Sequence, residues 1–197
     1  MLALWNLDLA FADVIATSSM AELGAIRLAW WRERLDDLDK GIGPPPEPRL
    51  QAVAASLIPA GVSGQELSQL EDCWVALLSP FPWGDAVADA LRTRGQILFG
   101  IGARLLGRAP AEGEPYGAIW SLVDGVRHCT DSQSRDYLIE RAKSAIVDLP
   151  RRRIPGKLRP LTMTAAFAAY DVLHDRAGGW RRVVSALRHS IFGIMPR

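Results

Sequence analysis

Apolar residues recur every three or four positions along most of the chain, a spacing typical of α-helices that bury one face. Residues 20–40 show it most clearly, because Leu28, Trp31, Leu35 and Leu38 fall on one helical stripe. No run of alternating β-branched residues is typical of a strand. The pattern therefore predicts an all-α protein.

Proline and glycine divide this pattern into eight or nine helices. The run from Gly43 to Pro46 is the clearest break, because proline lacks an amide donor and restricts the residue before it. Residues 17–19, Thr-Ser-Ser, are suited to end a first helix and to cap the next one. The expected helices cover about residues 2–16, 20–40, 47–57, 63–78, 85–106, 113–129, 132–149, 161–174 and 180–192.

The composition is that of a globular protein. A chain of 197 residues suits one domain, and 49% hydrophobic with 23% charged residues is neither a disordered nor a membrane balance. The formal net charge of +1 creates no overall field that would recruit nucleic acid. We therefore expect a single domain, residues 1–197, without a nucleic-acid partner.

Cysteine usage and the N-terminus indicate a cellular compartment. Cys73 and Cys129 lie far apart without CxxC spacing, so neither a disulfide framework nor a zinc site is expected. The N-terminus carries Asp8 and Asp13 and no basic region, unlike a secretory signal. No stretch reaches the ~18 apolar residues of a transmembrane segment. A cytoplasmic protein is expected, and the preference for Arg over Lys is typical of a GC-rich bacterial genome.

The most distinctive stretch is residues 22–35, ELGAIRLAWWRERL. It resembles the IRLxWWRxxL helix of the squalene/phytoene synthase family. The preceding LALWNLDLAFADV resembles a degraded form of that family's FYAFCRxxDDxxD helix. Weaker matches follow in the same order: Arg94-Gly95 with Gly107, then residues 116–129 at the QLxNILRDV position, then residues 159–171. The resemblance therefore spans nearly the whole chain.

This resemblance implies a fold and a class of ligand. It implies the isoprenoid synthase bundle, with helices around a central cavity that holds prenyl diphosphates, and a chain that lacks the family's N-terminal helix. Trp30, Trp31 and Gly95 are candidates for lining that cavity. Large aromatic residues at helical spacing are also typical of a core, and Gly95 is equally suited to a tight contact between helices.

Active members of the family ionise an allylic diphosphate with Mg²⁺ held by facing aspartates. Matching the first motif places Ala12, Asp13 and Ala16 at the three aspartate positions, so one carboxylate of the three remains. Asp8 is a poor replacement, because five helical residues rotate it by about 140° from Asp13.

The second motif is degraded as well. Matching residues 119–128 to QLxNILRD keeps Arg127 and places His128 at the aspartate position. Asp124 and Asp131 are two turns apart, roughly 10 Å, which is too far to bind one ion without a third group. A shift of one turn would instead pair Asp131 with Asp136. The expected remnant of a diphosphate and magnesium site is therefore Asp13, Arg127, His128 and Asp131, with no firm metal ligand.

Two charged segments have simpler explanations. Residues 36–39, Asp-Asp-Leu-Asp, end the second helix and suit a solvated helix end paired with nearby Arg. The basic loop 150–157 suits either solvent or the phosphates of lipid headgroups and diphosphates. The three histidines have no metal-ligand spacing.

Three readings remain. The first is a degenerate prenyltransferase that binds a prenyl or other lipid ligand, or that serves as an assembly protein with a protein partner, like the mitochondrial complex I assembly factor of this family. The second is an active, Mg²⁺-dependent enzyme that joins isoprenoid diphosphates into squalene or phytoene. The third is a purely structural helical module. Peripheral contact with a membrane is compatible with all three.

Overall fold

The computed structural model describes residues 1–174 and 179–196. Within these residues the chain forms nine α-helices, two short 3₁₀ helices and no strand, which confirms the predicted all-α class. The chain divides into two compact units, residues 1–80 and 81–197. The expectation of a single domain stays a prediction.

The N-terminal unit contains four helices: α1 (Leu2–Thr17), α2 (Ala21–Asp39), α3 (Pro48–Ser56) and α4 (Gly64–Ala76). Helix α2 packs against α4, and α1 packs against α3. The predicted stripe of α2 is buried, whereas Leu23 and Ile26 on another face are exposed. The predicted cap of α2 is wrong: its N-cap is Met20, while the Thr17 and Ser18 hydroxyls donate to carbonyls of α1.

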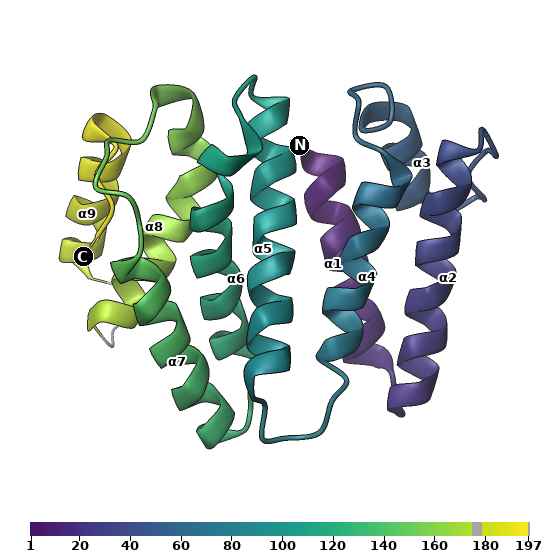
Figure 1. Cartoon of the computed structure of the whole chain (residues 1–197), viewed down its shortest axis with the longest axis horizontal. Helices are drawn as coiled ribbons and strands as arrows, with labels where there is room; N and C mark the ends of the chain where they lie inside the picture. The colour runs from purple at the N-terminus through teal and green to yellow at the C-terminus, as the bar shows by residue number, and fades with distance from the viewer. Residues whose placement is uncertain (175–178, 197) are drawn as a thin grey trace. The chain divides into compact units, whose positions relative to one another are not determined.

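The described residues of the C-terminal unit form five α-helices (Figure 1): α5 (Asp85–Leu105), α6 (Glu114–His128), α7 (Ser132–Val147), α8 (Arg159–His174) and α9 (Trp180–Phe192). The 3₁₀ helices η1 (Pro110–Glu112) and η2 (Gly156–Leu158) precede α6 and α8. Helix α6 is central in this unit, because it packs against α5, α7 and α8. Helix α9 packs on α8.

Glycines determine how closely α5 approaches α6. A Cβ atom on Gly95 of α5 would overlap the carbonyl oxygen of Gly117 on α6, and the reverse also holds. Neither position accepts a larger residue unless the two backbones separate. The close contact sets the path of α6, whose C-terminal half carries the residues matched to the second motif.

Candidate functional site

The residues matched to the first aspartate motif lie on α1, in the N-terminal unit. Asp13 is exposed and accepts a 2.6 Å hydrogen bond from Arg49 of α3. Asp8 is buried and accepts a 2.9 Å hydrogen bond from the indole of Trp74. The two carboxylates therefore lie on different faces of α1, as their five-residue spacing predicts.

The three candidates for lining a cavity have different surroundings. Trp31 is buried and meets the ring of Phe11 edge-on, with centroids 5.8 Å apart, while Trp30 is 40% exposed. Gly95 lies in the contact between α5 and α6, where the backbone of Gly117 occupies the space beside its Cα. Gly95 therefore lines a helix–helix contact.

A buried arginine organises the middle of α6. Arg94 of α5 is 3% exposed and donates to Asp124 at 2.9 Å and to the Ser121 hydroxyl at 3.4 Å. Its guanidinium carbon also lies 4.9 Å from the centroid of the Trp120 ring. Asp124 therefore neutralises a buried cation of the adjacent helix.

Arg127 belongs to a second charged group one turn further on. Its Nη2 donates to Asp171 Oδ2 of α8 at 2.7 Å. Asp171 also accepts from Arg182 Nη2 of α9 at 3.0 Å, and Arg182 Nε lies 2.8 Å from Asp171 Oδ1. The carboxyl group is largely buried and lies between two guanidinium groups, while Arg127 itself is about half exposed.

His128 and Asp131 lie where α6 ends and α7 begins. His128 is exposed, and its Nδ1 lies 2.9 Å from the backbone oxygen of Asp124. Asp131 is the N-cap of α7 and accepts from the Ser134 amide at 2.8 Å and from the Ser134 hydroxyl at 2.6 Å. These hydrogen bonds hold the pKa of Asp131 below its ordinary value, and the one from the hydroxyl has the larger effect. Asp131 therefore acts as a helix cap.

A cavity of about 590 Å³ lies among α6, α7 and α8. Its charged lining includes Arg127 from α6 and Asp136, Glu140 and Lys143 from α7, together with Asp171. Lys143 Nζ contacts Glu140 Oε1 at 2.8 Å. The apolar lining consists of Val123, Val126, Ile139, Val172 and Leu173. A cavity with an apolar wall and cations on two helices suits a ligand with an apolar chain and an anionic head.

The sequence indicated Arg127, and it offered Asp136 as an alternative partner of Asp131, but Glu140 and Lys143 of α7 were missed. Asp136, Ile139, Glu140 and Lys143 are spaced i, i+3, i+4 and i+7, so they share one helical face. This spacing in the sequence predicts a mixed charged and apolar face on α7. Aspartate pairs alone do not indicate this face, because a lysine and an isoleucine belong to it.

The acidic end of α2 has a structural role. Asp39 accepts from the Gly64 and Gln65 amides at 2.7 and 2.8 Å, which binds the N-terminus of α4. Asp37 pairs with Arg34 at 3.1 Å, in agreement with the predicted arginine-paired helix end. Among residues 1–174 and 179–196, no group of three His, Cys, Asp or Glu side chains is arranged to hold a metal ion.

Within the described part of the chain, every helix is too short or too polar to cross a bilayer. No family model, curated protein or solved structure matches this chain.

Proposed function

We propose that this protein binds a prenyl diphosphate or a related lipid phosphate without condensing it, as a degenerate relative of the squalene/phytoene synthases. The observation that carries this proposal is the engagement of the carboxylates around the second motif. Asp124 neutralises buried Arg94, Asp131 caps α7, and Asp171 pairs with Arg127. A carboxylate with such a role joins a magnesium site only by giving up that contact.

The cavity among α6, α7 and α8 supports the choice of ligand. Its apolar side chains suit an isoprenoid chain, and Arg127 and Lys143 are the cations available to phosphate oxygens. Arg127 is free to turn towards a phosphate at small cost, because Asp171 keeps Arg182 as a partner.

The acidic residues of α7 oppose this binding and therefore make it testable. Asp136 and Glu140 line the same cavity as the two cations, so they repel a diphosphate. Replacing Glu140 by Gln removes one repulsive charge and frees Lys143 from its 2.8 Å ion pair. The Glu140→Gln variant should bind a diphosphate more tightly than the natural chain.

The test is calorimetric titration of farnesyl diphosphate with and without Mg²⁺, together with an assay for released pyrophosphate. We expect heat of binding and no release of pyrophosphate. Lys143→Gln should weaken binding about tenfold, the usual size of one lost charge-assisted contact. Lys40→Gln is the matched control, because Lys40 is an exposed lysine at the end of α2 with a similar i,i+3 ion pair.

Three results contradict the proposal. One is the absence of binding under either condition, and another is equal binding by the Lys143→Gln variant and its control. The third is pyrophosphate release that depends on Mg²⁺, which would instead support active condensation to squalene or phytoene. An assembly role with a protein partner shares the non-catalytic premise and stays a prediction.

A further inference from the structure

Helix α9 packs with its polar side inward. Its fully buried side chain is His189, whereas Trp180 is 71% exposed and Ile191 is 59% exposed. Besides Phe192 at its end, the exposed large apolar residues of α9 are Trp180, Val183, Val184, Leu187 and Ile191. Their spacing of i, i+3, i+4, i+7 and i+11 places them on one side of the helix, which we call the α9 stripe.

Polar contacts hold the inner side of α9 against α8. His189 Nε2 lies 3.0 Å from the Thr162 hydroxyl, and both residues are buried. Arg182 pairs with Asp171, and its guanidinium carbon lies 4.4 Å from the centroid of the Phe167 ring. These contacts fix which side of α9 faces the protein, so the α9 stripe must face outward.

The C-terminal end of α9 is fixed as well. Arg159 donates to the carbonyls of Ser190 and Ile191 at 3.1 and 2.7 Å, and the Ile154 amide donates to Gly193 at 2.9 Å. Gly193 adopts a left-handed conformation with φ of 68°, which ends the helix. The contact with Ile154 also ties the basic loop 150–157 to this end of α9.

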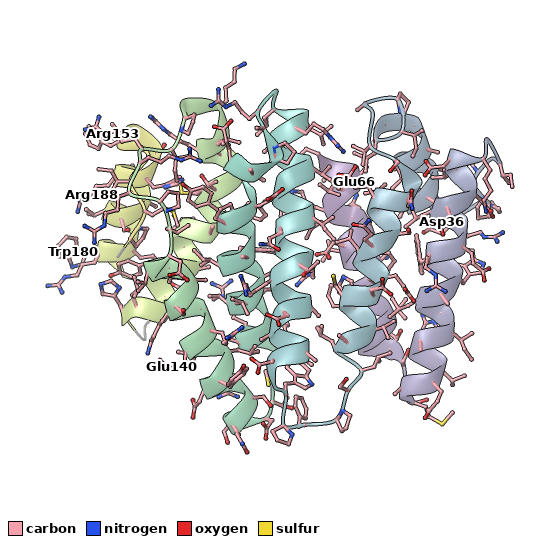
Figure 2. The ribbon with its side chains drawn as sticks, viewed as in Figure 1. Asp36, Glu66, Glu140, Arg153, Trp180 and Arg188 are labelled. Carbon is pink, nitrogen blue, oxygen red and sulfur yellow. The ribbon has the colours of Figure 1, made fainter. Side chains whose placement is uncertain are left out.

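Positive charge is concentrated around the stripe. Residues 150–197 contain ten Lys and Arg against two Asp and Glu, whereas residues 1–149 contain 13 against 20. Among the described residues of this region, the exposed cations are Arg151, Arg152, Arg153, Lys157, Arg181 and Arg188. Figure 2 shows Arg153, Arg188 and Trp180 pointing away from the ribbon on the α9 side of the unit.

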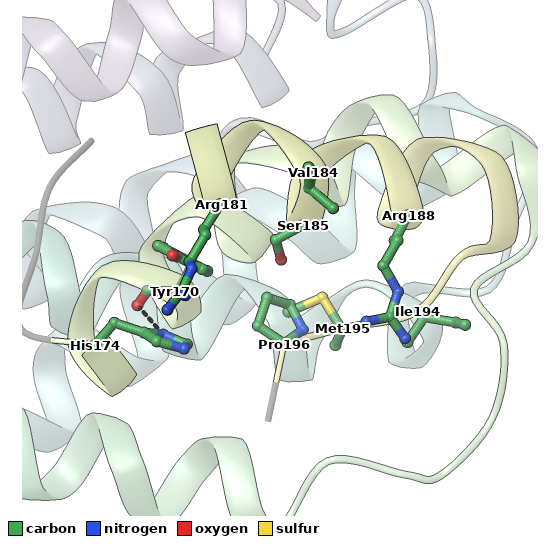
Figure 3. Close-up of a pocket in the computed structure, with 9 residues that line it drawn as sticks. All are labelled: Tyr170, His174, Arg181, Val184, Ser185, Arg188, Ile194, Met195 and Pro196. Atoms are coloured by element: carbon green, nitrogen blue, oxygen red, sulfur yellow. Dashed lines mark hydrogen bonds between the residues drawn. The ribbon is translucent and has the colours of Figure 1, made fainter. Parts of the chain in front are cut away.

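A cavity of about 410 Å³ lies beside α9 (Figure 3). Arg181 and Arg188 of α9 line it together with His174 of α8, and none of the described residues in its lining carries a carboxylate. Arg181 also lies against the Trp180 ring, 5.6 Å from its centroid. Guanidinium groups beside an exposed tryptophan match the phosphate and interfacial layers of a phospholipid surface.

We infer that α9 docks this protein on an anionic phospholipid membrane. The α9 stripe enters the boundary between headgroups and acyl chains, and Arg181, Arg188 and the basic loop 150–157 contact lipid phosphates. Apolar insertion together with a basic patch supplies the two signals that stable peripheral binding needs. The cations around the stripe favour this occupant over a neutral apolar protein surface.

The test is flotation of the 197-residue chain with phosphatidylcholine vesicles that do or do not contain phosphatidylglycerol. We expect binding to the anionic vesicles, and weaker binding when salt is raised. The Leu187→Ser/Ile191→Ser double variant should lose binding by about tenfold or more, because two inserted side chains become polar. The matched control is Leu23→Ser/Ile26→Ser, which changes two exposed apolar residues of α2 and should leave binding intact.

Charge reversal gives a second pair of variants. Arg181→Glu/Arg188→Glu should abolish the preference for anionic vesicles, whereas Lys40→Glu/Arg92→Glu, with the same change in net charge, should largely keep it. All these substitutions are at partly or fully exposed positions, and thermal unfolding will verify that each variant folds.

Three outcomes overturn the inference: no binding to anionic vesicles, equal loss in the α9 variants and their controls, or self-association through the α9 stripe in place of membrane binding. The last would appear as a dimer that Leu187→Ser/Ile191→Ser dissociates. These vesicles contain no isoprenoid diphosphate, so the result is independent of the proposed function.

Discussion

Gly95 of α5 and Gly117 of α6 meet backbone to backbone, and each occupies the space that a side chain of the other would need. The contact is reciprocal, since a Cβ on either residue overlaps the carbonyl oxygen of its partner. Backbone atoms cannot rotate away as the end of a flexible side chain can. The closeness of these two helices therefore depends on both residues remaining glycine.

Replacing Gly95 by Ala should lower the free energy of unfolding by about 3 kcal/mol, because the added methyl group forces the two helices apart. Urea unfolding followed by circular dichroism measures the change. Gly156→Ala is the control, because nothing lies within 4 Å of a Cβ at that position. Equal free energies of unfolding for Gly95→Ala and Gly156→Ala would mean that α5 and α6 can move apart without losing stability.

Breaking the pair of Arg94 and Asp124 should destabilise the fold far more than breaking the exposed pair of Arg49 and Asp13. Asp124→Ala removes the carboxylate that neutralises a 3% exposed guanidinium and should cost about 3 kcal/mol in denaturant unfolding. Asp13→Ala breaks an exposed pair and should cost less than about 1 kcal/mol. Comparable losses in the two variants would contradict the structural role assigned to Asp124.

Asp131 should behave as a helix cap. Asp131→Asn keeps an acceptor for the Ser134 amide and should retain the melting temperature, whereas Asp131→Ala should lower it. Because the pKa of Asp131 is lowered, its stabilisation is complete above the ordinary value of 3.8 and is lost as pH falls through the lower native pKa. Melting temperatures measured from above pH 3.8 downwards give this loss. In the Asp131→Asn variant the melting temperature should depend less on pH. Equal melting temperatures for the Asn and Ala variants would argue against the cap.

Acidification should destabilise the attachment of α9 through His189. Burial lowers the pKa of this imidazole, with a smaller contribution from the charge of Arg159, while backbone contacts at Arg159 and Ile194 act in the opposite direction. Below pH 6.5 the unfolded chain therefore binds more protons at this residue than the folded chain does. The stabilisation from neutral His189 is fully present above the ordinary pKa of 6.5 and decreases as the pH falls below that value.

Thermal unfolding between about pH 8 and pH 5 measures the effect of His189. His189→Gln should flatten the slope, whereas His128→Gln, at a 78% exposed side chain, should retain it. An unchanged slope in His189→Gln would assign the pH dependence to other groups.

The helices could be predicted from the sequence because their signals are local. The apolar period and the proline and glycine breaks placed every helix within about two residues of its observed ends. The cap of α2 was wrong, because the Thr17 and Ser18 hydroxyls bond back to α1.

The candidate site could be predicted only in part. The sequence singled out Arg127 and Asp131. Ser134, the partner of Asp131, is a local cap contact three residues on, but Asp171, the partner of Arg127, follows only from how α6 and α8 pack. The sequence of α9 shows an amphipathic helix without showing which side faces the protein. That orientation depends on Thr162 and Asp171, which supply polar partners on α8.

The inward polar side of α9 also determines how its detachment would respond to heat. An ordinary surface helix exposes apolar area when it separates, and the new hydration shell gives a large positive heat-capacity change. Helix α9 already exposes its apolar residues, so separation breaks mainly the contacts of His189, Arg182 and Arg159. The separation of α9 should therefore have little heat-capacity change, and its free energy should vary almost linearly with temperature. The free energy of unfolding of the α5–α8 core should instead follow a curve.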